Sequence, residues 1–384
     1  MTWIRCAVVA ALVPVAGVVP AVPVAATPVA PIGQLAYITT AGVLDVLNVN
    51  PDGSTSFPQR LGPITTVQSP KTVKVSSMVA SADGSRLAWS EVISKPDPTY
   101  GSLETGAVLV VRNMFTRHDV SLRSEYVPLG FAGHRLVVLG AHTKRLVMSP
   151  SPHLVKVHDH NAYPNTTYSG GIVDTVLSLG GHNDTVETDR LRLTTFGGHH
   201  KLLHTYQVGM TYRSVAANTY DAVSPDGRKL IVERGNHQDF SGLGPSSLFD
   251  TYSMGGGYTR HALGHFGTNR AKWRLAGATF VGANDTPWLA LHSDYVKTAN
   301  GYVVHGVVVR YAHGRWQKES SSAVAVAGLE SGWVVIQGGV WNEVPDSPDG
   351  EYAPSPTFPA LLKGPHGFHH TLADVQGTQI LWVG

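Results

Sequence analysis

Short apolar runs, separated by turn-forming residues, repeat along the chain from residue 34 onward. The segments 43–49, 107–111 and 135–139 are typical: each is rich in Val and Leu and about the length of one strand. Such runs, interrupted at short intervals by Gly, Pro, Asn and Asp, predict β-strands joined by tight turns. We find almost no helical periodicity. The pattern therefore predicts an all-β fold, either a sandwich or a radial repeat.

Self-similarity within the chain favours the radial repeat. Segments 78–89 and 221–232 share the frame Ser-x-Asp-Gly-x-x-Leu followed by two apolar residues. In such a turn Pro presets the first dihedral, Asp bonds to the nearby backbone and Gly accepts a positive φ. Looser copies of the same strand-turn-strand order occur at 127–139, 276–290, 323–335 and 372–383.

The turns Ser81-Ala82-Asp83-Gly84 and Ser224-Pro225-Asp226-Gly227 resemble the repeat of TolB-like (WD40-like) β-propellers. In that family the turn joins the innermost strand of each blade to the next strand. The resemblance implies that residues 34–384 form a single β-propeller domain. Ala82 replaces the family's proline in the first copy, so the second copy alone has the full motif.

The repeats also predict the number of blades. Seven inner hairpins are expected, and six blades are the alternative, because the hairpin at 172–195 has the weakest pattern. The N-terminal runs 34–39 and 43–49 have no inner hairpin before them, and the last hairpin has no strands after it. We therefore expect the two ends of the chain to complete one four-stranded blade and close the ring. The expected inner hairpins are 78–92, 127–141, 172–195, 220–233, 276–291, 323–337 and 371–383.

The N-terminus has the pattern of an export signal. Arg5 precedes an uncharged Ala/Val/Leu-rich run, and small residues around Ala26 fit a cleavage site. We predict a signal peptide over 1–26, a short linker over 27–33 and a secreted or cell-envelope location. An uncleaved leader that anchors the chain in a membrane is the alternative, although its prolines disfavour a regular spanning helix.

Charge and cysteine content exclude several classes of function. Lys+Arg number 29 and Asp+Glu 27, a formal net charge of +2, which gives no basic excess for nucleic-acid binding. The single cysteine, Cys6, lies in the predicted leader, so the mature chain has no disulfide and no thiolate. We expect a monomer.

No recognised catalytic or cofactor motif occurs in the sequence. It contains no Gly-x-Ser-x-Gly, His-Glu-x-x-His or phosphate-binding loop. Histidines cluster at 158–160, 199–200 and 366–370, but their spacing matches no metal signature, so we predict neither a metal site nor a cofactor. Trp89, Trp288, Trp333 and Trp382 occupy equivalent second-strand positions, which indicates packing between blades.

Four long connections follow the second strand of a unit, at 91–106, 234–247, 292–301 and 337–370. In a propeller all such links emerge on one face, and loops held by a rigid scaffold are common recognition sites. Trp316 and Trp341 are the tryptophans that we expect to be free for a ligand. The predicted binding residues are Tyr100, Glu104, His237, Asp239, Phe240, Tyr295, Trp341 and Glu343.

These features predict an exported, non-catalytic propeller that binds a protein or a cell-envelope glycan through this one face. The alternative is an enzyme, lactonase-like or lyase-like, that uses His, Asp and Arg at the mouth of the central channel. A third reading is a structural partner in an envelope complex, tethered by an uncleaved leader.

Overall fold

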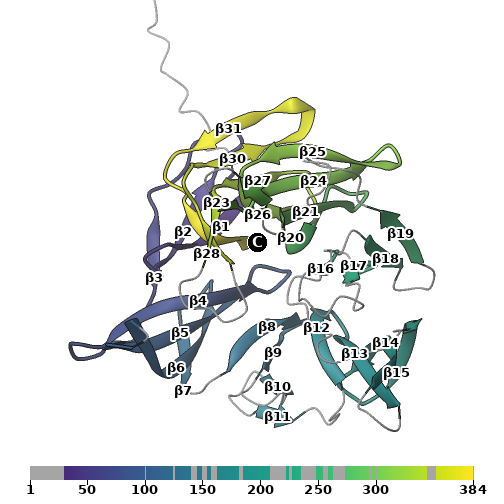
Figure 1. The fold of residues 1–384 in the computed structure, drawn as a ribbon. Coiled ribbons are helices and arrows are strands. Elements are labelled where there is room, and N and C mark those ends of the chain that lie inside the picture. The colour runs from purple at the N-terminus through teal and green to yellow at the C-terminus, as the bar shows by residue number, and fades with distance from the viewer. Residues whose placement is uncertain are drawn as a thin grey trace, which may run out of the picture. The chain divides into compact units, whose positions relative to one another are not determined.

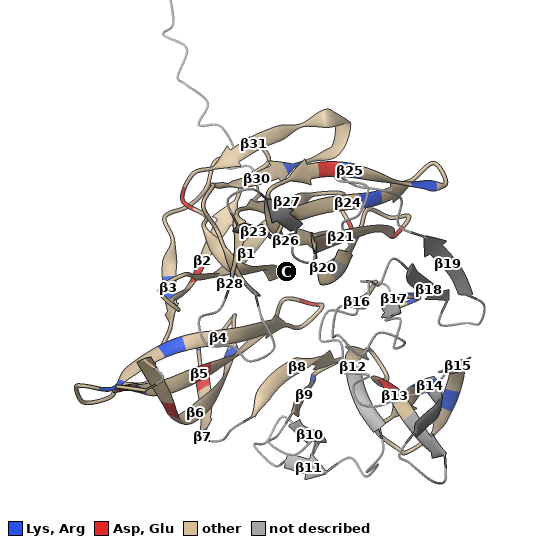
Figure 2. Cartoon of the chain, in the orientation of Figure 1, with Lys and Arg blue, Asp and Glu red and all other residues tan. Residues whose placement is uncertain are grey.

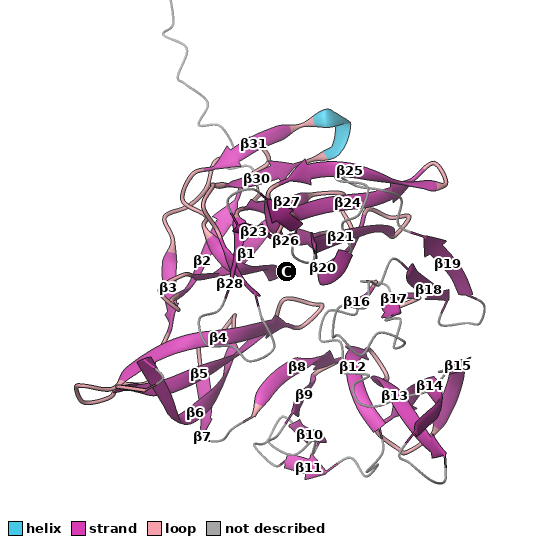
Figure 3. Cartoon of the chain, in the orientation of Figure 1, coloured by secondary structure: helices cyan, strands magenta, loops and turns pink. Residues whose placement is uncertain are grey.

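The protein is built from antiparallel β-sheets, as the computed structural model shows (Figures 1 and 3). Within the described part of the chain, the only helix is a single 3-10 turn, η1 (Pro365–Gly367), and none has the length to span a membrane. The structure describes residues 30–99, 101–123, 126–139, 145–148, 154–156, 162–180, 185–207, 222–224, 227–234, 248–253, 258–262, 273–293, 296–298, 301–343 and 352–383.

The described strands form seven four-stranded sheets, which we number in chain order. Sheet 1 contains β32 (Gly377–Val383), β1 (Gly33–Thr39), β2 (Leu44–Val49) and β3 (Gln59–Gly62). Sheet 2 contains β4 (Thr72–Ala80), β5 (Arg86–Asp97), β6 (Gly101–Asn113) and β7 (Asp119–Arg123). Sheet 3 contains β8 (Val127–Ala132), β9 (Arg135–Leu139), β10 (Arg145–Met148) and β11 (Leu154–Lys156).

The other four sheets have the same meander order. Sheet 4 contains β12 (Ala162–Tyr168), β13 (Gly171–Gly180), β14 (Thr185–Thr195) and β15 (His200–Gln207). Sheet 5 contains β16 (Ala222–Val223), β17 (Lys229–Arg234), β18 (Leu248–Ser253) and β19 (Tyr258–Ala262). Sheet 6 contains β20 (Trp273–Val281), β21 (Thr286–Ser293), β24 (Gly306–Ala312) and β25 (Arg315–Ser321). Sheet 7 contains β26 (Ala323–Gly328), β27 (Val334–Gly338), β30 (Ala360–Lys363) and β31 (His369–Leu372).

Two short hairpins are inserted into this pattern. One, β22 (Val296–Thr298) and β23 (Gly301–Val303), lies between β21 and β24 of sheet 6. The other, β28 (Val340–Glu343) and β29 (Tyr352–Ser355), lies between β27 and β30 of sheet 7. Both insertions therefore follow the second strand of their sheet.

Each hydrophobic cluster in the core joins two neighbouring sheets. Val46 of sheet 1 packs with Trp89 and Val110 of sheet 2, whereas Leu35 of sheet 1 packs with Val335 of sheet 7. Five further clusters join sheets 2 and 3, 3 and 4, 4 and 5, 5 and 6, and 6 and 7. The first strands β4, β8, β12, β16, β20, β26 and β32 contact one another in this succession, and β32 also contacts β4. Four-stranded meanders packed face to face in this way are the blades of a β-propeller fold.

The Ser-x-Asp-Gly turns have the local structure that their chemistry predicts. Ser81 Oγ accepts a hydrogen bond from Arg86 N at 2.9 Å and donates one to Asp83 Oδ1 at 2.6 Å. Gly84 has a φ of 66°, which a side chain would disfavour. The Ser224 hydroxyl likewise accepts a hydrogen bond from Lys229 N at 2.9 Å. In both copies the serine therefore fixes the start of the second strand.

This turn makes acid stability depend on Asp83. Hydrogen bonds, chiefly the one from the Ser81 hydroxyl, lower the pKa of Asp83 from 3.8 to about 2. Because the folded-state pKa is the lower one, the carboxylate stabilises the fold above pH 3.8, and this contribution is lost as the pH falls towards 2. We expect Asp83→Asn, which cannot titrate, to flatten the dependence of the unfolding free energy on pH in this window. Urea unfolding at a series of pH values measures this dependence. Ser81→Ala, which removes the main hydrogen bond to Asp83, should flatten it too. If both variants showed the same pH dependence as the unchanged protein, Asp83 would not be the group responsible.

Two of the predicted inner hairpins were assigned to the wrong strands. In sheet 4 the first hairpin is β12–β13, so the segment 172–195 contains the second and third strands. The segment 371–383 is not a hairpin: β31 is the last strand of sheet 7, whereas β32 pairs with β1. Sheet 1 therefore takes one strand from the C-terminal end of the chain and three from the N-terminal end.

Two of the predicted connections are largely strand. Residues 91–106 extend β5 and β6 into a long hairpin, and 337–370 include β30 and the start of β31 as well as an inserted hairpin. Trp89 and Trp288 lie on second strands, as predicted, but Trp382 lies on the first strand of sheet 1 and Trp333 lies just before β27.

Candidate functional site

The first candidate site is formed by the segments that follow second strands. In sheet 2, residues 95–97 pair with residues 101–103 beyond the reach of β4 and β7, so this part of β5 and β6 is a two-stranded arm, with Glu104 at its base. Leu103 and Glu104 lie on it and are exposed. With its polar and apolar side chains in solvent, the arm is available for contact with a partner.

The inserted hairpin of sheet 7 is anchored by Trp341. Its ring packs on His292 at the end of β21, with the ring centroids 4.7 Å apart, and its Nε1 is buried without a hydrogen-bond partner. Gly306 makes this packing possible, because a Cβ there would lie 2.8 Å from Trp341 Nε1 and 2.1 Å from the carbonyl oxygen of Ala323. Trp341 thus holds β28 against sheet 6.

The predicted binding residues are only partly placed. The structure brings Trp341 and Glu343 together on β28, and places Glu104 on another sheet, on the arm. Trp316 is buried against Tyr311 within sheet 6, so the expectation that it is free for a ligand was wrong. Tyr100, His237, Asp239, Phe240 and Tyr295 lie outside the described residues.

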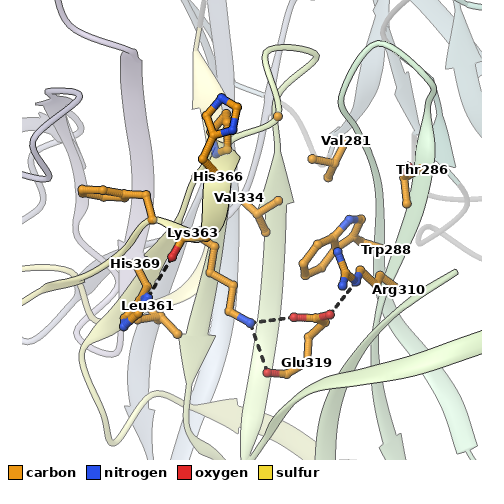
Figure 4. A pocket seen from close by; sticks show the side chains of 15 residues that line it. Val281, Thr286, Trp288, Arg310, Glu319, Val334, Leu361, Lys363, His366 and His369 are labelled. Carbon is orange, nitrogen blue, oxygen red and sulfur yellow. Dashed lines mark hydrogen bonds and ion pairs between the residues drawn. The ribbon is translucent and has the colours of Figure 1, made fainter. Parts of the chain in front are cut away.

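The second candidate site, which the sequence did not indicate, is a groove between sheets 6 and 7 (Figure 4). Its volume is about 590 Å³. Sheet 6 lines it with Val281, Thr286, Trp288, Arg310 and Glu319, and sheet 7 lines it with Gly332, Val334, Leu361, Lys363 and the turn 364–369. The groove therefore combines apolar walls with a small group of charges.

The charged groups of the groove meet at Glu319. Its two carboxylate oxygens lie 2.5 Å from Arg310 Nε and 2.6 Å from Lys363 Nζ. The Arg310 guanidinium also lies over the Trp288 ring, 5.9 Å from its centroid. Because Lys363 belongs to sheet 7 and the other three residues to sheet 6, the ion pair joins the two sheets across the floor of the groove (Figure 4). Charged positions are otherwise sparse along the described strands (Figure 2).

The sequence contains no signal for the meeting of charges at Glu319. Arg310 pairs with Gln317, so strand alternation places Glu319, two residues further along, on the same face as Arg310, although a β-bulge at Glu319 interrupts the pairing. Finding the cluster requires knowledge that β24 pairs with β25 and that Lys363 approaches from sheet 7. The histidine cluster 366–370 was noticed in the sequence, and His366 and His369 lie at the edge of this groove.

Metal ligands do not gather in the described part of the chain: no three of its His, Cys, Asp or Glu residues are placed to hold one ion. At the groove, His369 Nδ1 instead lies 3.1 Å from the carbonyl oxygen of Gly367, a contact within its own turn. Two cations and one carboxylate at the floor, within an otherwise largely apolar lining, are a combination typical of binding pockets.

No protein-family model matches the chain, and no curated protein is similar to it in sequence. Similar solved structures include a protein from Lactobacillus plantarum, with a TM-score of 0.47 and 9% identity over 91% of this chain and 98% of that one. The β-propeller domain of the Trilobed protease from Pyrococcus furiosus has a TM-score of 0.42 and 10% identity, over 79% of this chain and 88% of that one. The GH74 enzyme of Niastella koreensis has a TM-score of 0.39 and 11% identity, over 91% and 61%. At these values the comparisons assign no family, activity or ligand to this chain.

Proposed function

We propose that the chain is an exported, TolB-like, seven-bladed propeller that binds a protein or a cell-envelope glycan without catalysis. In this proposal the leader 1–26 is removed, the domain 34–384 is released as a monomer or retained in the envelope, and the seven sheets are the blades of one closed ring. The contacts of β32 with both β26 and β4 support closure, because they leave no gap in the succession of first strands.

The position of the insertions is the observation that carries the binding role. The arm and both inserted hairpins follow the second strand of their sheets. In a closed ring these links lie on one face, opposite the Ser-x-Asp-Gly turns. We name this surface the insertion face.

Exposed apolar side chains support a binding role for the insertion face. Leu103 on the arm is 41% exposed, and Val340 and Phe358, at the two ends of the inserted segment of sheet 7, are 39% and 53% exposed. Apolar side chains held in solvent on protruding segments are typical of protein-binding surfaces. Glu104, next to Leu103 on β6, would add a polar contact with the partner.

The test is capture by the purified domain, with two sources of ligand. One experiment measures sedimentation of the domain with purified cell-wall glycan, and a second measures its cross-linking to proteins in an envelope extract. We expect the double variant Leu103→Ser, Phe358→Ser to lose most of the capture that the unchanged domain shows, about tenfold. Phe115→Ser is the matched control, because Phe115 is 78% exposed but lies in the turn between β6 and β7, which is on the opposite face. Equal capture by the double variant and the control would contradict the proposal.

A further inference from the structure

We propose that the groove between sheets 6 and 7 is a second binding site, for a carboxylate carried by an apolar group, such as the C-terminus of a peptide that ends in an apolar residue. The juxtaposition of Arg310, Glu319 and Lys363 at the floor of this groove carries the inference. The site is separate from the insertion face. The turns that line the groove join the first strand of a sheet to the second, or the third strand to the fourth, whereas the insertions join the second strand to the third.

The floor has one positive charge in excess. Two cations share the single carboxylate of Glu319, and the side chain of Glu319 is 14% exposed, against 27% for Lys363 and 41% for Arg310. The cations are thus the members of the group that face solvent. A second carboxylate, supplied by a ligand, would balance the charge.

The cations also have hydrogen-bond donors to offer. Arg310 is ion-paired with Glu319 through Nε and donates a hydrogen bond from Nη2 to Gln317 Oε1 at 3.4 Å, out of five guanidinium N–H groups. Lys363 Nζ donates to Glu319 Oε2 and, at 3.3 Å, to the Glu319 carbonyl oxygen, which are two of its three donors. Charge-assisted hydrogen bonds from such groups are the usual means of holding a carboxylate.

The walls of the groove select what the carboxylate is attached to. Val281, Trp288 and Val334 are buried against one another in the core shared by the two sheets, and the partly exposed Leu361 and Phe368 supply the apolar surface that lines the groove above them. Such walls favour an apolar side chain over a sugar, whose hydroxyl groups would lose hydrogen bonds to water. At about 590 Å³ the groove has room for the last residues of a peptide.

Titration calorimetry with three small probes tests the site in the full-length domain. The probes are acetyl-Ala-Ala-Leu with a free carboxylate, the same peptide as its C-terminal amide, and hexanoate. We expect the free peptide to bind at least about tenfold more tightly than the amide. Weaker but measurable binding of hexanoate would show that the carboxylate and an apolar group suffice.

Two variants with opposite expected effects distinguish this site from a purely structural ion pair. Arg310→Gln removes the excess charge and should weaken binding of the free peptide about fivefold. Glu319→Gln raises the excess to two charges and should strengthen it by a similar factor, whereas a merely structural role would give no gain. Arg315→Gln, at the exposed start of β25 and outside the groove, should leave affinity unchanged.

Melting curves of each variant establish that it is folded before binding is compared. If Glu319→Gln does not fold, the comparison of free peptide with amide and the effect of Arg310→Gln still decide the question. Equal binding of peptide and amide, or no binding of either up to about 10 mM, would overturn the proposal. Binding of an oligogalacturonate in preference to the peptide would also overturn it, in favour of an acidic glycan.

Discussion

A chain that ends at Gln379 is expected to lose its cooperative unfolding transition. The missing residues are most of β32, the strand that pairs with β1 and completes sheet 1. Ile380 and Trp382 belong to the core cluster shared with sheet 7, and Val383 belongs to the cluster shared with sheet 2. Burial of three such side chains contributes about 6 kcal/mol, comparable with the whole stability of a typical domain, about 5–15 kcal/mol.

Hydrogen bonds add to the role of this strand. Trp382 Nε1 donates to the carbonyl oxygen of Ala327 in sheet 7 at 3.3 Å. Gln379 accepts from Met78 N at 3.0 Å and donates to Met78 O at 3.3 Å, so its amide pairs with the backbone of sheet 2. Gln337 Oε1 of sheet 7 accepts from Gly377 N at 3.0 Å. The strand is therefore bound to sheets 2 and 7. The shortened chain keeps the bonds of Gly377 and Gln379 but loses that of Trp382, together with the apolar contacts of Ile380, Trp382 and Val383 with both sheets.

Calorimetry and near-UV circular dichroism of the shortened chain measure the effect. The matched control removes seven residues of the arm, 96–102, and joins the ends with Asn-Gly. Because neither β4 nor β7 pairs with this end of the hairpin, we expect the melting temperature of the control to be nearly unchanged. A shortened chain that melts at the same temperature as the control would contradict the role of β32 in completing sheet 1.

The fold class could be predicted because local turn chemistry and apolar runs determine it. Ser81, Asp83 and Ser224 make the contacts expected of them. The position of each strand within its sheet was harder to predict, because a turn motif shows where the chain bends but does not show which two strands of a sheet the bend joins. Asn50-Pro51-Asp52-Gly53 has the same Pro-Asp-Gly chemistry but joins β2 to β3, the second and third strands of its sheet.

The groove could not be predicted because its parts are unrelated in the sequence. Arg310 and Glu319 are nine positions apart and lie on two strands whose pairing the sequence does not show, and Lys363 comes from another sheet. Nothing in the repeat indicates that these three side chains meet. The positions of three insertions, at 91–106, 292–301 and 337–370, could be predicted, since they depend only on the order of strands within each unit. The fourth, 234–247, lies almost wholly outside the described residues.

Glu91→Ala is expected to destabilise the protein by about 4 kcal/mol. The sequence places Glu91 at the start of a long connection, but in the structure it lies within β5 and is completely buried. Its carboxylate accepts hydrogen bonds from Ile64 N at 2.7 Å, Thr65 N at 2.9 Å and Trp89 Nε1 at 2.8 Å. Removing the acceptor leaves the buried Trp89 Nε1 and two partly buried backbone donors without this partner. Each bond to a charged group contributes about 1.5–3 kcal/mol, and solvent recovers part of it for the two backbone donors.

The location of these bonds makes the effect large. Ile64 and Thr65 lie in the link between sheets 1 and 2, so Glu91 holds this link against sheet 2. Glu91→Gln keeps one acceptor oxygen and should lose about half as much stability, while Glu104→Ala, which removes an exposed glutamate of the arm, should change it by less than about 0.5 kcal/mol. Urea unfolding of the three variants measures these differences. If Glu91→Ala were as stable as Glu104→Ala, the link would have to be held by its apolar contacts alone, and the buried carboxylate would contribute nothing to the joining of the two sheets.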